Sequence, residues 1–167
     1  MQGSICSRAA RDGGLTPSDL ERLAAVACSA ANAGGLELMR HYGRLSSIES
    51  KGRIGDLVTN ADVAAERIVL KLLEEQTPEI AVLAEESGAA GQQDGLRWCV
   101  DPLDGTTNFA HGYPFFATSI GLTLGQQPIL GAIAVPFLNE MYWGAPGIGA
   151  FCNDIPLQVS RCDRLED

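Results

Sequence analysis

The pattern of apolar and polar positions predicts two long helices followed by a series of strands. The first helix begins at Thr16-Pro17-Ser18-Asp19, where a threonine can cap free amides, the proline needs no donor and an acid lies in the first turn. Small residues predominate from Ala24 to Gly34, and the helical pattern continues to about Tyr42, before Gly43. We therefore expect another element to pack closely against this helix.

The second helix has the clearest periodicity in the chain. Apolar residues between Ala61 and Leu73 recur at intervals of three and four, Asn60 can act as the cap, and Pro78 lies beyond the end. This pattern predicts an amphipathic helix whose apolar stripe packs on a core. The polar stretch between the two helices, residues 46–56, predicts an exposed loop or a loose hairpin.

From Ile80 onward the periodicity changes to that of strands. Short runs rich in glycine, proline or asparagine separate the apolar segments IAVLA, RWCV, FFATSIGLTLG, PILGAIAV, EMYWGA and GAFCN. Short connections favour antiparallel neighbours. The predicted fold class is therefore α+β, with two helices packed on a largely antiparallel sheet.

One predicted strand is apolar on both of its faces. Alternation places Ile129, Ile133 and Val135 on one face and Leu130, Ala132 and Ala134 on the other. Two helices can cover only one face of a sheet. We therefore expect the second face to pack against a partner subunit or against a further half of the fold.

The composition fits one globular domain with an acidic surface. The chain has 167 residues, of which 46% are hydrophobic, and 12 Lys and Arg against 21 Asp and Glu give a net charge of -9. This balance argues against a nucleic-acid backbone or an anionic membrane surface as the main partner, and a phosphate substrate would need metal ions as mediators. No apolar run approaches the ~18 residues of a membrane span.

The cysteines and the amino-terminal residues bear on the compartment and the domain boundary. Five scattered cysteines, without a C-x-x-C pair, indicate neither a disulfide framework nor a zinc site and fit a reducing cytoplasm. Residues 1–14 contain no apolar stretch of signal-peptide length, and we expect a flexible tail. The alternative is a short organellar transit segment, which Arg8 and Arg11 would suit. Residues 15–167 would then form a single lobe.

The stretch WCVDPLDGTTNF, residues 98–109, places two carboxylates three residues apart where an apolar strand ends. A turn at Pro102 can bring Asp101, Asp104 and the Leu103 carbonyl toward one point. Magnesium prefers oxygen ligands of this kind. A plain Pro-x-Asp-Gly turn is an equally good interpretation of the two aspartates taken alone.

Other polar groups are candidates for the same site. Glu85 and Glu86 also follow an apolar strand, so their carboxylates should emerge at a similar sheet edge. Gly105 and Thr106 begin a segment whose amides can bind phosphate and whose hydroxyl can hydrogen-bond a water. Asp62 lies in the first turn of the second helix. Each also has an ordinary interpretation, as a solvated acidic loop, a helix cap or an acid favoured by the helix dipole.

These motifs together resemble the inositol monophosphatase family of magnesium-dependent phosphatases. The matching motifs are DLVT with Asp62, then AEES around Glu85, then WCVDPLDGTTNF, in the family's order and spacing, over roughly residues 15 to 160. Fructose bisphosphatases and nucleotide-phosphate phosphatases share the Asp-Pro-x-Asp-Gly core, but TTNFAH is closer to the monophosphatase form. The resemblance implies the first half of an αβαβα layered sandwich.

The resemblance also implies a metal site. Glu85, Asp101 and the Leu103 carbonyl are expected to hold a first Mg²⁺ ion. Asp101 is then expected to bridge to a second ion, which Asp104 also holds.

The resemblance implies the remaining roles in the hydrolysis of a small phosphomonoester. Asp62 and Thr106 are expected to orient the attacking water, beside the catalytic Glu85. The amides of Gly105 and Thr106 would hold the phosphate, and Lys51 lies in a loop that approaches the site.

Family members continue for roughly as many residues again, into a second α/β layer with a further aspartate ligand and most of the substrate pocket. We therefore expect residues 15–167 to be an amino-terminal metal-binding lobe that binds Mg²⁺ weakly and hydrolyses inositol 1-phosphate slowly or not at all. A homodimer is expected only if the missing half is supplied. The alternative is a non-catalytic interaction or heterodimer module that uses the exposed sheet face. The sequence does not determine which phosphate ester is the substrate.

Overall fold

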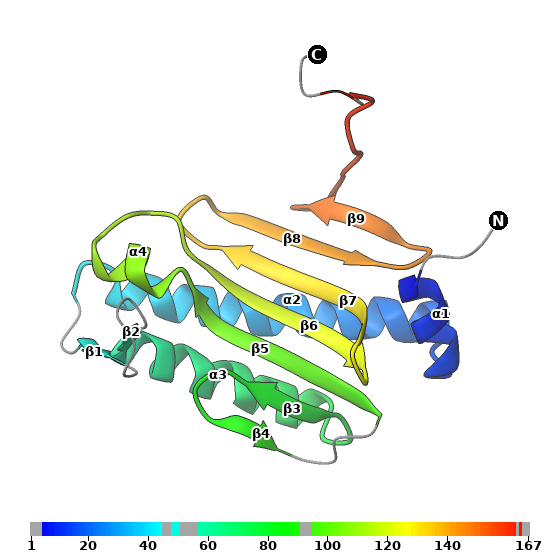
Figure 1. The fold of residues 1–167 in the computed structure, drawn as a ribbon, viewed down its shortest axis with the longest axis horizontal. Coiled ribbons are helices and arrows are strands. Elements are labelled where there is room, and N and C mark those ends of the chain that lie inside the picture. Colours follow the sequence, from blue (N-terminus) through cyan, green and yellow to red (C-terminus); the bar gives the residue numbers. More distant parts are fainter. Residues whose placement is uncertain (1–4, 45–47, 51–56, 91–94, 163, 165–167) are drawn as a thin grey trace.

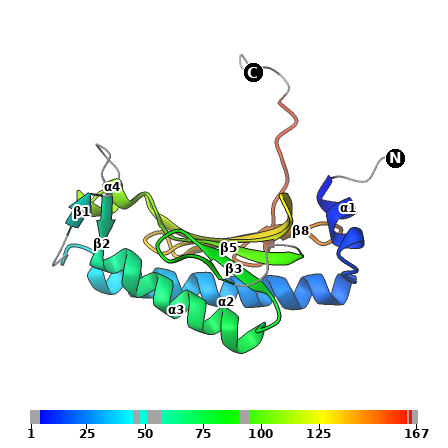
Figure 2. The same cartoon turned by 60° about the horizontal axis from the view of Figure 1, so that its bottom comes forward.

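The computed structural model describes residues 5–44, 48–50, 57–90, 95–162 and 164. In this part of the chain two long helices cover one face of an eight-stranded sheet (Figure 1, Figure 2). The helices are α1 (Ile5–Asp12), α2 (Pro17–His41), α3 (Asn60–Gln76) and α4 (Thr106–Ala110). The strands of the large sheet are β3 (Ala81–Ala84), β4 (Gly88–Ala90), β5 (Leu96–Asp104), β6 (Ala117–Leu124), β7 (Gln127–Val135), β8 (Glu140–Ala145), β9 (Gly149–Cys152) and β10 (Ile155–Pro156).

Helix α2 begins and ends where the sequence predicts. The Asp19 amide donates to the Thr16 hydroxyl at 3.2 Å, and the Thr16 amide donates to the Asp19 carboxylate at 2.9 Å. This capping box satisfies amides that have no partner within the helix. At the other end Tyr42 is the cap, and Gly43 takes the left-handed conformation with a φ of 71°.

Helix α3 has a different cap from the one predicted. The cap is Thr59, and Asn60 is the first residue of the helix. The Thr59 hydroxyl accepts a hydrogen bond from the Ala61 amide at 3.1 Å, and the Thr59 amide donates to the Asp62 carboxylate at 2.8 Å. Thr59 and Asp62 together complete a second capping box, which Asn60 cannot form because Asp62 is only two residues away from it.

The small residues of α2 allow the close packing that the sequence predicts. A Cβ atom added at Gly34 would lie 2.9 Å from a methyl carbon of Val69 on α3 and 2.9 Å from a methyl carbon of Thr118 on β6. Both contacts are shorter than packed carbon atoms tolerate. The main hydrophobic core therefore lies between α2, α3 and the sheet, and it includes Trp98, Ile120 and Leu122, which are almost completely buried.

The large sheet is mostly an antiparallel meander, which confirms the predicted α+β class. Its strand order is β10-β9-β8-β7-β6-β5-β3-β4, and each neighbouring pair is antiparallel except β3 and β5. The parallel pair joins Ala84 to Val100, so these two strands end at the same edge of the sheet.

The second face of the sheet has no helix over it in the described residues (Figure 2). Ile133 on β7 points to this face and is 42% exposed, whereas its neighbours Ala132 and Ala134 lie buried beneath the helices. Ile129 was predicted to share the face of Ile133, and this prediction is wrong. The β6–β7 register skips Ile129, which forms a β-bulge and is buried in the main core.

The predicted flexible tail over residues 1–14 is wrong in its described part, because Ile5–Asp12 form helix α1. This helix lies against β7, and its Ala10 is buried in the main core. The Gly14 amide donates to the Arg11 carbonyl and the Leu15 amide donates to the Ala10 carbonyl, each at 3.0 Å. Short helices depend on tertiary packing and end caps of this kind, which periodicity alone does not show.

The polar stretch between α2 and α3 is described only in part. Strands β1 (Ile48–Ser50) and β2 (Leu57–Thr59) pair antiparallel, in agreement with a hairpin. Lys51 lies outside the described residues. No helix in the described part of the chain is long and apolar enough to cross a membrane, and Cys28, Cys99 and Cys152 form no disulfide bonds.

Candidate functional site

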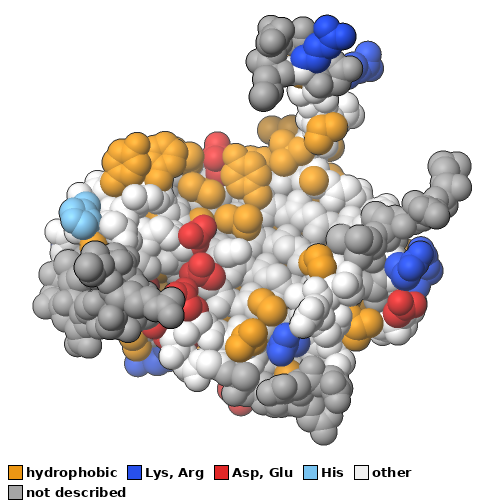
Figure 3. All heavy atoms as spheres, viewed as in Figure 1, with side chains coloured by type: hydrophobic (Ala, Val, Ile, Leu, Met, Phe, Trp, Pro, Cys, Tyr) orange, Lys and Arg blue, Asp and Glu red, His pale blue; other side chains and the backbone are white. Residues whose placement is uncertain are grey.

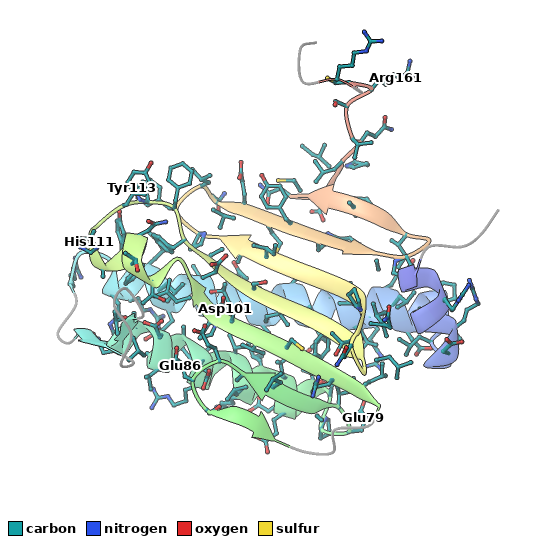
Figure 4. All side chains as sticks on the ribbon, viewed as in Figure 1. Glu79, Glu86, Asp101, His111, Tyr113 and Arg161 are labelled. Atoms are coloured by element: carbon teal, nitrogen blue, oxygen red, sulfur yellow. The ribbon has the colours of Figure 1, made fainter. Side chains whose placement is uncertain are left out.

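Acidic side chains gather at the edge where the parallel strands β3 and β5 end. The Glu85 amide donates to the Val100 carbonyl at 3.1 Å, which continues the ladder by one residue and places Glu85 beside Asp101. Figure 3 shows a cluster of acidic side chains on the sheet face that the helices leave uncovered. Figure 4 shows Asp101 within β5 and Glu86 just beyond the end of the neighbouring strand β3.

A β-bulge brings the two aspartates of the DPLD segment, residues 101–104, to the same face of the sheet. In a regular strand, residues three apart point to opposite faces. Here Asp101 pairs with Ser119 and Asp104 pairs with Ala117, so three steps on β5 oppose two steps on β6. Ser119 and Ala117 lie two residues apart and share a face of β6. The extra residue in β5 therefore places Asp101 and Asp104, which pair with them, on one face as well.

Asp101 is the most perturbed carboxyl group of this edge. Burial, followed by the charge of Glu85, a side-chain hydrogen bond with Glu85 and the charge of Asp104, raises the pKa of Asp101 to about 7. The Leu103 amide opposes this shift by donating to Asp101 Oδ1 at 3.1 Å. Two carboxylates that share a hydrogen bond must hold a proton between them. A divalent cation can take the place of that proton.

The backbone of the DPLD segment is held on both sides. The buried Thr118 hydroxyl donates to the Pro102 carbonyl at 2.9 Å. The Thr106 hydroxyl lies 3.0 Å from the Leu103 carbonyl oxygen and can donate its one proton there or to Asp62. A carbonyl oxygen has two lone pairs, so the Leu103 oxygen keeps one acceptor position beyond this bond.

Asp62 and Thr106 meet at the same edge from distant parts of the sequence. The Thr106 hydroxyl lies 3.2 Å from Asp62 Oδ1, while Asp62 Oδ2 accepts bonds from the Thr59 amide at 2.8 Å and the Thr59 hydroxyl at 2.6 Å. Asp62 is only 1% exposed. The capping box of α3 therefore fixes the carboxylate so that its second oxygen faces Thr106.

Gly105 connects β5 to α4 in a conformation that suits glycine alone. Its φ is 88°, and an added Cβ would lie 2.8 Å from the Phe115 carbonyl oxygen. The Asn108 side chain donates to the same oxygen at 2.8 Å. Gly105 is the N-cap of α4 and has no side chain that could bond the first amides of this helix.

A second, smaller hydrophobic core packs beneath the DPLD turn and the start of α3. Its buried members are Leu38, Ala61, Ala65, Leu103, Phe109 and Phe116. The Phe109 and Phe116 rings pack edge to face with centroids 4.8 Å apart, and the Tyr42 ring lies within 5.5 Å of both. Leu103 and Ala61 thus link the DPLD turn and the start of α3 to one rigid cluster.

The donor groups at this edge suit a hard cation. They are carboxylate oxygens from Glu85, Asp101 and Asp104 and the Leu103 carbonyl, with no thiol or imidazole among them. Within the described residues, no three His, Cys, Asp or Glu side chains converge closely enough to make a complete metal site. The charges of Glu85 and Asp104 nevertheless act on Asp101, so the three form a partial set of ligands.

Comparisons with known proteins identify the family. The model of the inositol monophosphatase family matches residues 19–167. The chain belongs to this family. It is 45% identical over 153 residues to an inositol-1-monophosphatase of Synechocystis, covering 91% of this chain and 53% of that protein. It is also 38% identical over 150 residues to a fructose-1,6-bisphosphatase/inositol-1-monophosphatase of Aquifex aeolicus, covering 89% of this chain and 56% of that protein.

The fold agrees with solved structures of the family. The crystal structure of the extragenic suppressor protein suhB from Bartonella henselae matches with a TM-score of 0.80 and 41% identity, covering 85% of this chain and 56% of that one. The chain thus spans about half the length of the relatives that it matches.

The family motifs that the sequence singled out meet at one edge in space. Glu85 lies beside Asp101, and Asp104 shares the face of Asp101. Thr106 Oγ1 lies within hydrogen-bond distance of both Asp62 and the Leu103 carbonyl. The sequence interpretation overlooked Glu66, a buried acid on α3 whose carboxylate reaches the loop after β3. The available signal was its spacing, four residues after Asp62, which places both acids on one helix face.

Proposed function

We propose that the chain forms the metal-binding half of a Mg²⁺-dependent phosphomonoesterase of the inositol monophosphatase family. The observation that carries this proposal is Asp101, which shares a hydrogen bond with Glu85 and has a pKa raised to about 7 beside Asp104. Carboxylates held this close repel one another when ionised, and a divalent cation in place of the shared proton relieves that repulsion.

The ligands proposed for a first Mg²⁺ ion are Glu85, Asp101 and the Leu103 carbonyl, and those for a second are Asp101 and Asp104. Magnesium bound there supplies Lewis acidity, which makes a water more acidic and offsets the charge of the phosphate. The proposal is supported by the all-oxygen donor set and by the bulge that turns both aspartates to one face.

The proposed base is the Asp62–Thr106 pair. The Thr106 hydroxyl lies 3.2 Å from Asp62 Oδ1 and 3.0 Å from the Leu103 carbonyl oxygen. When its one proton points to Asp62, its lone pairs can accept a hydrogen bond from a water. As that water attacks the phosphorus, the ester P–O bond breaks and the departing alkoxide takes a proton from solvent. The proton of the attacking water passes to Thr106 Oγ1, and the Thr106 proton passes to Asp62 Oδ1. The buried capping box holds Asp62 in position for this transfer.

The amides of Gly105 and Thr106 are proposed to bind the phosphate oxygens, supported by the uncapped start of α4. Lys51 keeps its proposed role as a residue that approaches the substrate. The substrate is proposed to be a small phosphomonoester such as inositol 1-phosphate, in keeping with the names of the relatives. We also propose that the protein is cytoplasmic and binds neither nucleic acid nor a membrane. A homodimer is proposed once a second half is supplied.

The test is release of phosphate from inositol 1-phosphate with and without Mg²⁺. Because the chain spans about half the length of its relatives, we expect slow turnover or none from the chain alone. In a form completed with the corresponding second half of a relative, we expect Mg²⁺-dependent turnover that Asp101→Asn abolishes. Unchanged turnover after this substitution would overturn the site assignment, and turnover without Mg²⁺ would overturn the mechanism.

A further inference from the structure

Glu66 is a buried acid that the proposed reaction does not use. It lies on α3, is 5% exposed, and belongs with Asp62 to the buried acids of the described residues. A buried carboxylate is costly unless hydrogen bonds compensate it. Glu66 Oε2 accepts a hydrogen bond from the Glu86 amide at 2.8 Å, across the gap between α3 and the end of β3.

This bond acts on the backbone of a proposed metal ligand. The amide on one side of Glu85 is its own, which donates to the Val100 carbonyl at 3.1 Å. The amide on the other side is that of Glu86, which donates to Glu66. Both peptide planes that flank the Glu85 α-carbon are therefore anchored, one to β5 and one to α3. Anchored planes restrict the direction in which the exposed Glu85 side chain leaves the backbone.

Helix α3 carries Glu66 and Asp62 one turn apart, so both project from the same face. Asp62 holds Thr106, and Glu66 holds the loop that carries Glu85. A single rigid helix thus sets the spacing between the two proposed parts of the site, the proton acceptor and the metal ligands.

We propose that Glu66 is a positioning residue that orients Glu85 for the metal through the Glu86 amide. The inference rests on the proposed function, since it takes Glu85 as a ligand. A purely structural role would make Glu66 matter for stability alone. Between variants of equal stability, a positioning role predicts a change in metal affinity and a purely structural role predicts none.

The test measures the affinity of the 167-residue chain for Mn²⁺, used as the probe, by electron paramagnetic resonance of the unbound ion. Glu66→Gln keeps the length and an acceptor oxygen, whereas Glu66→Asp keeps the charge but is one methylene too short to reach the Glu86 amide. We expect Glu66→Asp to weaken Mn²⁺ binding by about tenfold or more, the range for residues that support metal ligands, and Glu66→Gln to stay within about threefold.

The matched control is Val69→Ala, which opens a cavity on the same buried face of α3 without touching Glu86. It should lower the unfolding temperature and leave Mn²⁺ affinity unchanged. Hydrogen exchange at the Glu86 amide, measured by NMR without metal, should quicken in Glu66→Asp and not in Glu66→Gln or Val69→Ala. If Glu66→Asp does not fold, Glu66→Ala takes its place with the same criteria.

The outcomes separate this inference from the function on which it rests. A parent chain that binds no Mn²⁺ overturns the proposed function itself. A parent chain that binds Mn²⁺, with Glu66→Asp or its substitute binding equally well, overturns only the role of Glu66. A loss in Glu66→Gln without a loss in Glu66→Asp would also overturn it, because the charge of Glu66 rather than its reach to the amide would then control the affinity.

Discussion

At the scale of single residues, Asp101 links the chemistry of the site to the stability of the fold. Its carboxyl group is partly buried, shares a hydrogen bond with Glu85 and is affected by the charge of Asp104. The charged form is therefore unfavourable in the folded chain without a cation. A residue placed in this way serves a ligand rather than the fold, because a fold selected for stability alone would avoid such a repulsive cluster.

We predict that the metal-free chain loses stability as the pH rises from about 4 to about 7. The folded pKa of Asp101, about 7, lies above its ordinary value of 3.8, so the folded state holds a proton that the unfolded state releases in this interval. The free energy of unfolding should fall by on the order of 2 kcal/mol, after allowance for solvent screening, and level off above pH 7. Urea unfolding across this pH range measures it.

The control for this prediction is Asp101→Asn, which should flatten the decline because the amide does not titrate. Added Mg²⁺ should restore stability above pH 7, where the carboxylates are ionised. A parent chain whose stability rises or stays constant between pH 4 and 7 would contradict the account of Asp101.

At the scale of elements, the β5–α4 junction shows how much the sequence could predict. The strand, the turn and the small residues after it could all be predicted from WCVDPLDGTTNF. The bulge could not, because it depends on the pairing of Asp101 and Asp104 with a strand more than ten residues later in the chain. The same limit explains the buried Ile129, whose bulge breaks the alternation on which its assignment rested.

Two other elements differ from the sequence prediction for related reasons. Periodicity placed α3 correctly, but the choice of Thr59 over Asn60 as its cap depends on the reciprocal bond with Asp62. Helix α1 is only eight residues long, too short for its periodicity to predict a helix by itself, and its packing against β7 stabilises it. Glu66 was overlooked because its partner is a backbone amide twenty residues away, which carries no side-chain signature.

We predict that Gly105→Ala destabilises the chain through this junction. Alanine would meet both the left-handed conformation and the Phe115 carbonyl at 2.8 Å, so the free energy of unfolding should fall by about 2–3 kcal/mol. Gly125→Ala is the matched control, because Gly125 has a φ of 56° but nothing within 4 Å of an added Cβ. It should cost about 1 kcal/mol. If urea unfolding gives Gly105→Ala and Gly125→Ala equal losses of unfolding free energy, the Phe115 carbonyl does not constrain the junction.

At the scale of the whole molecule, the uncovered sheet face and the coverage of the relatives agree with each other. Ile133 lies 42% exposed on that face, and the chain matches 53% of the Synechocystis protein. We propose that a further half of the family fold covers this face and completes the ligand set. The acidic edge lies on the same side of the sheet (Figure 3). One added layer would therefore cover Ile133 and also close the site.

The central claim is that the acidic edge at Asp101 binds a divalent cation. The most direct measurement is calorimetric titration of the chain with Mg²⁺ at pH 8, where Asp101 is ionised. We predict weak, saturable binding that Asp101→Asn abolishes and that Asp19→Asn, a substitution in the distant cap of α2, leaves intact. No binding by the parent chain, or equal binding by Asp101→Asn, would contradict the claim.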